Sequence, residues 1–300
     1  MTKDTEKQGE LFILSGAFLW GLFPIITLLS YATLSPLVSL TGSALFAAVF
    51  FSIIITIQRR WGEFAQKNSY KDLFMATLIT AIIFYLLTFF GLQHTTPGNV
   101  SIIALTEVFF SYLFFHVWQK DNIPKEHVAG ALLMVLGAIF VLYPNVHTPR
   151  IGDLLILLAA AIAPFGNYFQ RRARKSVSSQ TIMLFRSVIS GLFVLFLAMM
   201  VKAPFSTVDM QTSLIFLAIN GTFMLGVSKI FWIEGIHRIS VVKANALSAL
   251  APLITLLTAW AVLRIPPTLW QVLAFIPMFI GILLLGVKNK QEVLAPQENN

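Results

Sequence analysis

Ten long apolar stretches constrain this chain more than any other feature of its sequence. An α-helix needs about 20 apolar residues to cross the ~30 Å hydrocarbon core of a bilayer. Such stretches occupy roughly residues 11–31, 36–57, 72–92, 98–118, 126–144, 151–170, 179–201, 212–235, 241–262 and 268–287. Each is apolar throughout rather than alternating, which disfavours a β-barrel. The sequence therefore predicts an all-α integral membrane protein with ten transmembrane helices, numbered here as spans 1 to 10.

The composition agrees with a lipid environment. Hydrophobic residues make up 57% of the chain and charged residues 11%, whereas soluble domains carry about 25% charged residues. The net charge of +8 comes mainly from cations in short segments between the apolar stretches, so we expect no nucleic-acid partner. The polar segments 1–10 and 289–300 are expected to be tails. Cysteine is absent, which excludes disulfides and cysteine-based metal sites.

Lysine and arginine are distributed unevenly between the two sides of the predicted bundle. With the N-terminus in the cytoplasm, the cytoplasmic segments hold sixteen of these residues, and the outer loops hold only Arg150, Lys202 and Arg264. In membrane proteins the cytoplasmic loops carry the excess of positive charge. We therefore expect a multi-pass protein of the inner (plasma) membrane, with both termini and the segment RRARKSVSS in the cytoplasm.

The chain resembles itself when it is shifted by 143–144 residues. The segment GLQHTTPGNVSIIALTEVFF aligns with GIHRISVVKANALSALAPLI, and VAGALLMVLGAIFVLY aligns with VLAFIPMFIGILLLGV. These copies correspond to residues 11–145 and 146–288, with five spans each. Because five is odd, the second copy enters the membrane from the opposite side. Inverted repeats of this kind build many secondary transporters, with the substrate site between the repeats.

Several short motifs add a family resemblance to this architecture. They are LWG at Leu19–Gly21, LFRSVISG around Arg186, LTEVFF in span 4, LAPLIT in span 9 and the glycines of spans 5 and 10. On these motifs the chain resembles the EamA type of the drug/metabolite transporter (DMT) superfamily over nearly its whole length. The resemblance implies a carrier with a central cavity among spans 1, 3, 4, 6, 8 and 9. It also implies a small metabolite as substrate, since many bacterial members resemble exporters of amino acids or related compounds.

The chain also departs from the pattern of that family at three positions. Ser43 stands where the first half often has an arginine, Val108 replaces a common proline, and Arg264 stands where an acidic residue often follows span 9.

Three charged residues, Glu107, Arg186 and Lys229, lie well away from the ends of the predicted spans. A charge at the bilayer centre costs about 2.5–3.5 kcal/mol and normally faces the bundle interior or water. Glu107 shares a helical face with Ala104 and Ser111. It is either a substrate-binding or protonatable carboxylate, with Ser111 beside it, or a structural acid satisfied by a neighbour. Arg186 is either a bridge to backbone carbonyls or a gate.

Lys229 has two interpretations. It is either an ammonium in the cavity, with Trp232 on the same face, which meets Glu107 or an anionic substrate group, or a side chain that extends to the cytoplasmic interface. In the repeat alignment Tyr85 is equivalent to Lys229, and Ala251 is equivalent to Glu107. Both charges therefore break the internal symmetry, which favours a single asymmetric site.

Aromatic and amide side chains complete the predicted substrate-binding site. Trp20, Tyr85 and Tyr168 are candidates for an aromatic wall, and Asn245 in span 9 is a candidate polar contact. The alternative for each aromatic residue is ordinary packing or lipid contact. Asn167 and Gln170 of span 6 are expected near the cytoplasmic mouth.

Motifs for catalysis and cofactor binding are missing from the sequence. It contains no GxSxG, no HExxH and no phosphate-binding glycine loop, and its five histidines are scattered. We therefore expect no enzyme activity, no cofactor and no metal centre.

These features predict a secondary active transporter that exports a small metabolite, an amino acid or related zwitterion, by alternating access. Its expected partners are the small-molecule substrate and the lipid bilayer, with a proton as candidate coupling ion, and the expected assembly is a monomer or weak dimer. The alternatives are a transporter of organic cations, an integral-membrane enzyme acting on lipid-linked substrates, and a membrane sensor or assembly subunit.

Overall fold

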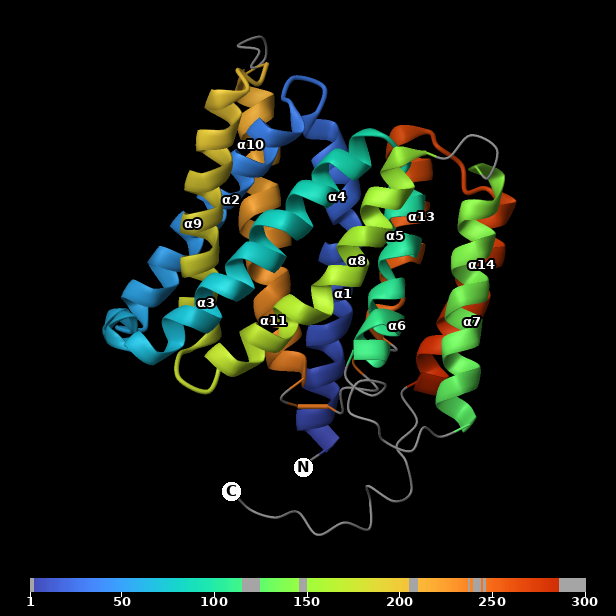
Figure 1. Ribbon diagram of the computed structural model, residues 1–300, viewed down its shortest axis with the longest axis horizontal. Coiled ribbons are helices and arrows are strands. Elements are labelled where there is room, and N and C mark those ends of the chain that lie inside the picture. Colours follow the sequence, from blue (N-terminus) through green and yellow to red (C-terminus); the bar gives the residue numbers. More distant parts are fainter. Residues whose placement is uncertain are drawn as a thin grey trace.

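The protein is a helical bundle in which the two halves of the chain pack against each other (Figure 1). The computed structural model describes residues 3–114, 125–145, 150–204, 210–236, 238–239, 244 and 247–285. Within these residues each of the ten predicted spans contains helix. Six helices are long and apolar enough to cross a membrane, and three more are apolar but shorter. The prediction of an all-α membrane protein with two repeats is confirmed.

The first half contains spans 1 to 5. Its helices are α1 (Lys3–Ser30), α2 (Pro36–Ile57), α3 (Tyr70–Ala76), the π-helical η3 (Thr77–Ile83), α4 (Phe84–Gln93), α5 (Pro97–Ala104), α6 (Thr106–Tyr112) and α7 (Lys125–Leu142). Short 3₁₀ turns at η1 (Trp61–Ala65), η2 (Lys67–Ser69) and η5 (Tyr143–Asn145) connect or end these helices. Helix α1 begins eight residues before the predicted start of span 1, so the polar N-terminal segment extends the helix.

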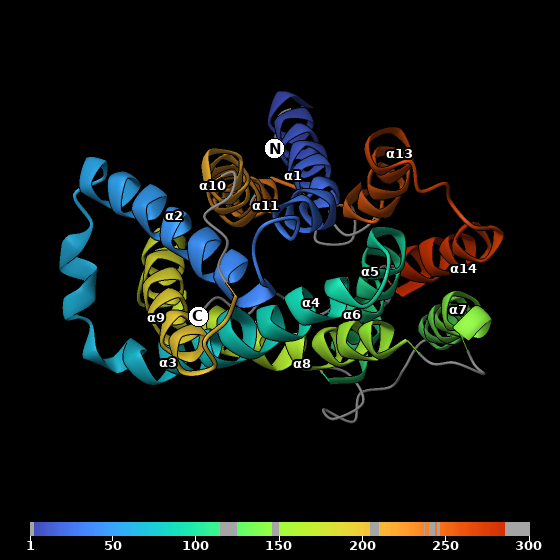
Figure 2. The same ribbon diagram turned by 90° about the horizontal axis from the view of Figure 1, so that it is seen from above.

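The second half contains spans 6 to 10. Its helices are α8 (Ile151–Ala173), α9 (Ser179–Met200), α10 (Met210–Ile219), the π-helical η6 (Asn220–Val227), α11 (Ser228–Ile236), α13 (Ala251–Leu263) and α14 (Leu269–Leu285). Seen from above, α2 lies beside α9 at one end of the bundle and α7 beside α14 at the other (Figure 2). Helices α1, α11 and α13 line one side between these pairs, and α4, α6 and α8 line the other.

Spans 2 and 7 begin and end in the same way, 143 residues apart. Ser35 accepts a hydrogen bond from the amide of the third residue after it, and so does Ser178, as expected of N-caps. Each helix ends at a cation with left-handed backbone, Arg59 (φ 53°) or Lys202 (φ 49°). In both cases the next amide binds the carbonyl five residues back, at 3.0 and 2.8 Å. These are Schellman caps, and their shared offset supports the repeat.

Spans 5 and 10 cross at small residues that are related by the same repeat. A Cβ atom on Gly130 would lie 2.8 Å from the carbonyl of Gly281, and one on Gly137 would lie 2.8 Å from the carbonyl of Ala274. The repeat offset of 144 residues relates Gly130 to Ala274 and Gly137 to Gly281. The contact between Gly130 and Gly281 therefore corresponds to the contact between Gly137 and Ala274, with helices α7 and α14 exchanged. Small residues permit such close helix packing in membranes, and the exchange is the signature of a pseudo-two-fold axis between the repeats.

Four of the spans contain irregular helix that the sequence analysis predicted as continuous helix. The π-helical segments η3 in span 3 and η6 in span 8 begin at Thr77 and Asn220, again 143 residues apart. Span 4 is interrupted at Leu105, and span 9 has a turn at Ala249–Leu250, just before α13. At the first break the Thr106 hydroxyl donates to the Ile103 carbonyl at 2.6 Å. A hydroxyl that occupies a backbone carbonyl competes with the helical hydrogen bond, which apolar periodicity does not reveal.

Candidate functional site

Glu107 lies on the first turn of α6, immediately after the break in span 4. Its carboxylate accepts a hydrogen bond from the Asn167 side chain of α8, with the Asn167 Nδ2 and Glu107 Oε1 atoms 2.9 Å apart. Glu107 is half-buried although it lies in the middle of a predicted span. The carboxylate therefore has one neutral partner and retains capacity to accept further hydrogen bonds.

Lys229 lies on the first turn of α11, immediately after the π-helical segment of span 8. Its ammonium nitrogen is 3.5 Å from the centroid of the Trp20 ring of α1, a cation–π contact. The Trp20 ring is also stacked on Phe23, with centroids 4.8 Å apart and 7° between the ring planes. Lys229 and Trp20 are both half-buried.

The charges of Glu107 and Lys229 interact without forming an ion pair. Each lies within the electrostatic range of the other, yet no ion pair within 4 Å joins them in the described part of the chain. Instead each charge has a neutral partner from the other half of the chain. The interior thus holds one carboxylate and one ammonium, each with a neutral partner.

Arg186 on α9 lies on the same side of the bundle as the start of α1, which we call the N-terminal side. Its guanidinium donates to the Gln170 side chain at 2.7 Å and to the Thr80 carbonyl, within the π-helical segment η3, at 3.2 Å. Its Nε atom is buried without a hydrogen-bond partner in the described structure. Lys229 also lies within its electrostatic range. We call Arg186, Gln170 and Thr80 the arginine cluster.

An equivalent cluster without charge lies toward the side of the bundle opposite the N-terminal side. The Asn220 amide, at the start of η6, donates to the hydroxyls of Thr27 and Ser43, both at 3.1 Å. The repeat offset of 143 residues relates Thr27 to Gln170 and Ser43 to Arg186. We call Asn220, Thr27 and Ser43 the asparagine cluster. Both clusters attach a π-helical segment to the two neighbouring helices of the bundle.

The aromatic candidates lie in different environments. Tyr85 is buried and packs against Phe23 and Phe89, with centroids 6.3 and 6.4 Å away, and it lies within electrostatic range of Glu107. Tyr168 is 38% exposed and lies under the Arg172 guanidinium, 5.7 Å from the ring centroid.

The remaining candidates include one that the structure does not describe. Trp232 packs against Ile13 and Ile239 near the start of α1. Ser111 is half-buried on α6, one turn beyond Glu107. Asn245 lies outside the described residues. The structure therefore brings Glu107, Lys229, Trp20, Tyr85 and Arg186 into one interacting group and places Tyr168 and Trp232 beside other residues.

The contact between Asn167 and Glu107 was not predicted from the sequence. Asn167 was expected near the cytoplasmic mouth of span 6, and the structure shows that its amide also pairs with Glu107 on span 4. The sequence signal was an amide side chain, Asn167, that follows Pro164 and Gly166 within an apolar helix. Gln170 was likewise not connected with Arg186, because no sequence pattern pairs residues of different spans.

The fold and this group of charges define a class of protein. Two repeats of five spans, related by a pseudo-two-fold axis, enclose a carboxylate and an ammonium that form no ion pair in the described residues, as in multi-pass membrane transporters. The sequence profile of the EamA-like transporter family matches the chain twice, at residues 7–143 and 150–287. The chain belongs to the EamA-like transporter family.

Similar proteins agree with this assignment. An uncharacterized transporter of Methanothermobacter thermautotrophicus is 24% identical over 226 residues, which cover 73% of this chain and 65% of that relative. An uncharacterized transporter of Bacillus subtilis is 24% identical over 247 residues, covering 79% of both chains. A solved crystal structure with 16% identity superposes with a TM-score of 0.67 and covers 93% of this chain and 96% of that one, which shows a shared fold.

In the described residues no three histidine or acidic side chains gather as a metal site.

Proposed function

We propose that the protein is a secondary active transporter of a small zwitterion, such as an amino acid, and exports it by alternating access between the two repeats. The observation that carries this proposal is the separation of Glu107 from Lys229. A carboxylate and an ammonium that interact without pairing complement a substrate with an amine and a carboxylate. Their present partners, Asn167 and Trp20, are neutral, so a substrate can replace either contact without leaving a buried charge unpaired.

A flux assay with substrates of matched size tests the roles of the two charges. Purified protein is reconstituted into liposomes, and uptake is compared for an amino acid, its amide and its decarboxylated amine. Lys229→Ala should weaken the transport of substrates with a carboxylate about tenfold and leave the amine almost unchanged, since a charge-assisted hydrogen bond contributes ~1.5–3 kcal/mol. Arg150→Ala, at an exposed position before α8, is the control. Equal loss for all three substrates would contradict the assignment of Lys229.

Glu107 has a second proposed role, as the group that exchanges a coupling proton. A half-buried carboxylate with one neutral partner can be protonated when the ammonium of a substrate leaves. Glu107→Gln retains the shape of the side chain and an oxygen to accept from Asn167. It should fold and bind but lose the dependence of flux on pH. Flux equal to that of the wild type at every pH would make Glu107 a structural acid.

An organic cation is the alternative substrate, and the position of Trp20 favours testing it. Its ring already binds an ammonium, that of Lys229, and a quaternary amine could occupy the same face. In that case choline should compete with transport, and Trp20→Leu should abolish the competition. Competition by zwitterions alone would favour the first proposal.

The orientation and assembly are part of the same proposal. The side of the bundle where α1 begins is cytoplasmic, the membrane is the inner membrane, and the protein is a monomer or weak dimer. Because the chain lacks cysteine, Ser176→Cys provides a single label in the segment between α8 and α9. Labelling of intact cells by an impermeant reagent would refute this orientation, and light scattering of the detergent complex would test the assembly.

A further inference from the structure

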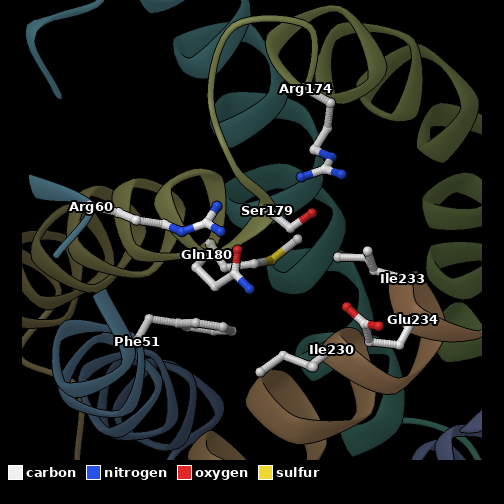
Figure 3. A pocket seen from close by; sticks show the side chains of 9 residues that line it. Phe51, Arg60, Arg174, Ser179, Gln180, Ile230, Ile233 and Glu234 are labelled. Atoms are coloured by element: carbon white, nitrogen blue, oxygen red, sulfur yellow. The ribbon is translucent and has the colours of Figure 1, made fainter. Parts of the chain in front are cut away.

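A pocket on the N-terminal side of the bundle lies outside the group of charges described above (Figure 3). Its volume is about 160 Å³, comparable with cavities of ~150 Å³ that hold a benzene-sized ligand. Arg60 and Arg174 reach it from the segments that follow α2 and α8, and Ser179 and Gln180 belong to the first turn of α9. Phe51 and Ile230 supply an apolar wall.

Neither guanidinium group has an acidic side chain within hydrogen-bond distance in the described structure. Arg174 has no acidic partner among the described residues. Arg60 has only a long contact, with its Nη1 atom 3.6 Å from the Glu63 carboxylate. The other oxygen of that carboxylate, Oε2, accepts from the Ser178 amide at 2.6 Å and from the Thr181 hydroxyl at 2.7 Å, so only Oε1 faces Arg60. Guanidinium forks match the geometry of carboxylate and phosphate oxygens.

Ser179 gives a second, independent indication of a ligand. The residue is 5% exposed, its hydroxyl oxygen has no hydrogen-bond partner in the described structure, and it lines the pocket. A buried polar group without a partner costs about 1–3 kcal/mol, which a ligand oxygen would offset.

One acidic side chain lies on the opposite wall of the pocket. Glu234 of α11 faces the arginines across the pocket (Figure 3). It is paired with Arg238, with Arg238 Nη1 and Glu234 Oε2 2.5 Å apart. This pairing leaves Arg174, with Arg60 and its long contact to Glu63, as the dominant charge of the pocket.

We propose that this pocket binds an oxyanion, a phosphate or carboxylate group, between Arg60 and Arg174 with the Ser179 hydroxyl as a further donor. The site is separate from the Glu107 and Lys229 group and does not depend on which substrate is transported. The anion can belong to a free solute or to the headgroup of a membrane lipid.

Thermal unfolding of the full-length protein in detergent tests the proposal, because a ligand of the folded state raises the unfolding midpoint in a saturable way. The probes are inorganic phosphate and the soluble short-chain lipid dihexanoyl phosphatidylglycerol. Arg174→Gln should weaken the apparent affinity about tenfold or more and Ser179→Ala about threefold, as expected for loss of a charged and a neutral donor. Lys175→Gln removes an exposed cation of the same segment and is the matched control.

The outcomes are distinguishable. Saturation by phosphate with the affinity of the lipid identifies a free anion as ligand, and saturation by the lipid alone identifies a headgroup. Absence of saturation with both probes, or equal weakening by Lys175→Gln and Arg174→Gln, overturns the proposal. A normal flux for Arg174→Gln beside its weakened binding keeps this test separate from that of the proposed function.

Discussion

The arginine cluster and the asparagine cluster occupy equivalent positions in the two repeats but differ in charge. Arg186 binds Gln170 and a carbonyl of η3 at one end of the bundle, and Asn220 of η6 binds Thr27 and Ser43 at the other. π-Helical segments frequently mark functional positions, and here each is attached by a polar contact. Inverted repeats provide two equivalent positions, and the polar attachments at these two positions differ in charge.

Each cluster also contains one buried polar atom without a hydrogen-bond partner in the described structure. These atoms are Arg186 Nε and Asn220 Oδ1. In the arginine cluster the unsatisfied atom belongs to a charged group, and in the asparagine cluster it belongs to a neutral amide. Loss of a partner is more costly for a charge than for an amide in the same environment. Matched substitutions should therefore lower the free energy of unfolding more in the arginine cluster than in the asparagine cluster.

Gln170→Leu should have the largest effect. It removes the closest acceptor of the buried guanidinium of Arg186 and should lower the free energy of unfolding by about 3 kcal/mol. The measurement is unfolding in mixed detergent micelles. Gln170→Glu keeps an acceptor oxygen and should remain close to the wild type. A loss below about 1 kcal/mol for Gln170→Leu would mean that water already solvates Arg186.

Gly221→Ala should be the next most damaging change, because the asparagine cluster depends on close packing rather than on charge. A Cβ atom there would lie 2.4 Å from the Ser43 carbonyl oxygen and 3.0 Å from the Ala47 amide nitrogen, and neither backbone atom can move alone. We expect a loss of about 2 kcal/mol, typical of overpacking. Gly62→Ala, where nothing lies within 4 Å, is the control and should change little.

The equivalent position in the other repeat sharpens this prediction. Gly221 corresponds to Leu78, which is 44% exposed, so Leu78→Ala should have a small effect on the unfolding free energy. If Leu78→Ala proved as costly as Gly221→Ala, the π-helical segments η3 and η6 would be packed alike, and the predicted difference between them would be wrong.

Thr27→Val tests the neutral counterpart of Gln170. It removes one hydroxyl acceptor of Asn220 while Ser43 still accepts from the same amide, so the free energy of unfolding should fall by about 1 kcal/mol. The same micelle titration measures it beside Gln170→Leu. A cost equal to that of Gln170→Leu would show that charge does not distinguish the clusters.

Glu63 accepts a hydrogen bond from Ser178, the N-cap residue of span 7, and should contribute a smaller stabilisation that depends on pH. Desolvation raises the pKa of Glu63, but hydrogen bonds from Ser178 and Thr181 and the charge of Arg60 outweigh it, so its pKa lies below the ordinary value of 4.5. Its stabilisation is therefore complete above that value and is lost as the pH falls through the lowered pKa. Glu63 is partly exposed, so we expect only about 0.5 kcal/mol.

Thermal midpoints between pH 7 and pH 3 measure this contribution. The difference between wild type and Glu63→Gln should be present at pH 7 and vanish in acid. Ser35 has no carboxylate partner among the described residues, so the cost of Ser35→Ala should not change with pH over this range. A Glu63→Gln difference that persists at pH 3 would assign the effect to packing.

The sequence by itself determined the ten spans, the two repeats and the three charges inside the membrane. Spans follow from runs of apolar residues, which depend on local composition alone. The repeat follows from a constant offset, and the structure reproduces it in the caps of spans 2 and 7 and in the glycine contacts of spans 5 and 10. Charges are conspicuous in apolar segments, so Glu107, Arg186 and Lys229 were all identified.

Only the tertiary structure decided what those charges contact. Glu107 faces Asn167, Lys229 faces Trp20, and Arg186 faces Gln170, and each pair joins different spans. Hydropathy and spacing describe one helix at a time, whereas these contacts depend on the rotation and crossing of two helices. The π-helical segments and the break before Glu107 were missed for the same reason, because a backbone carbonyl leaves its helical partner only where a neighbouring side chain or helix satisfies it.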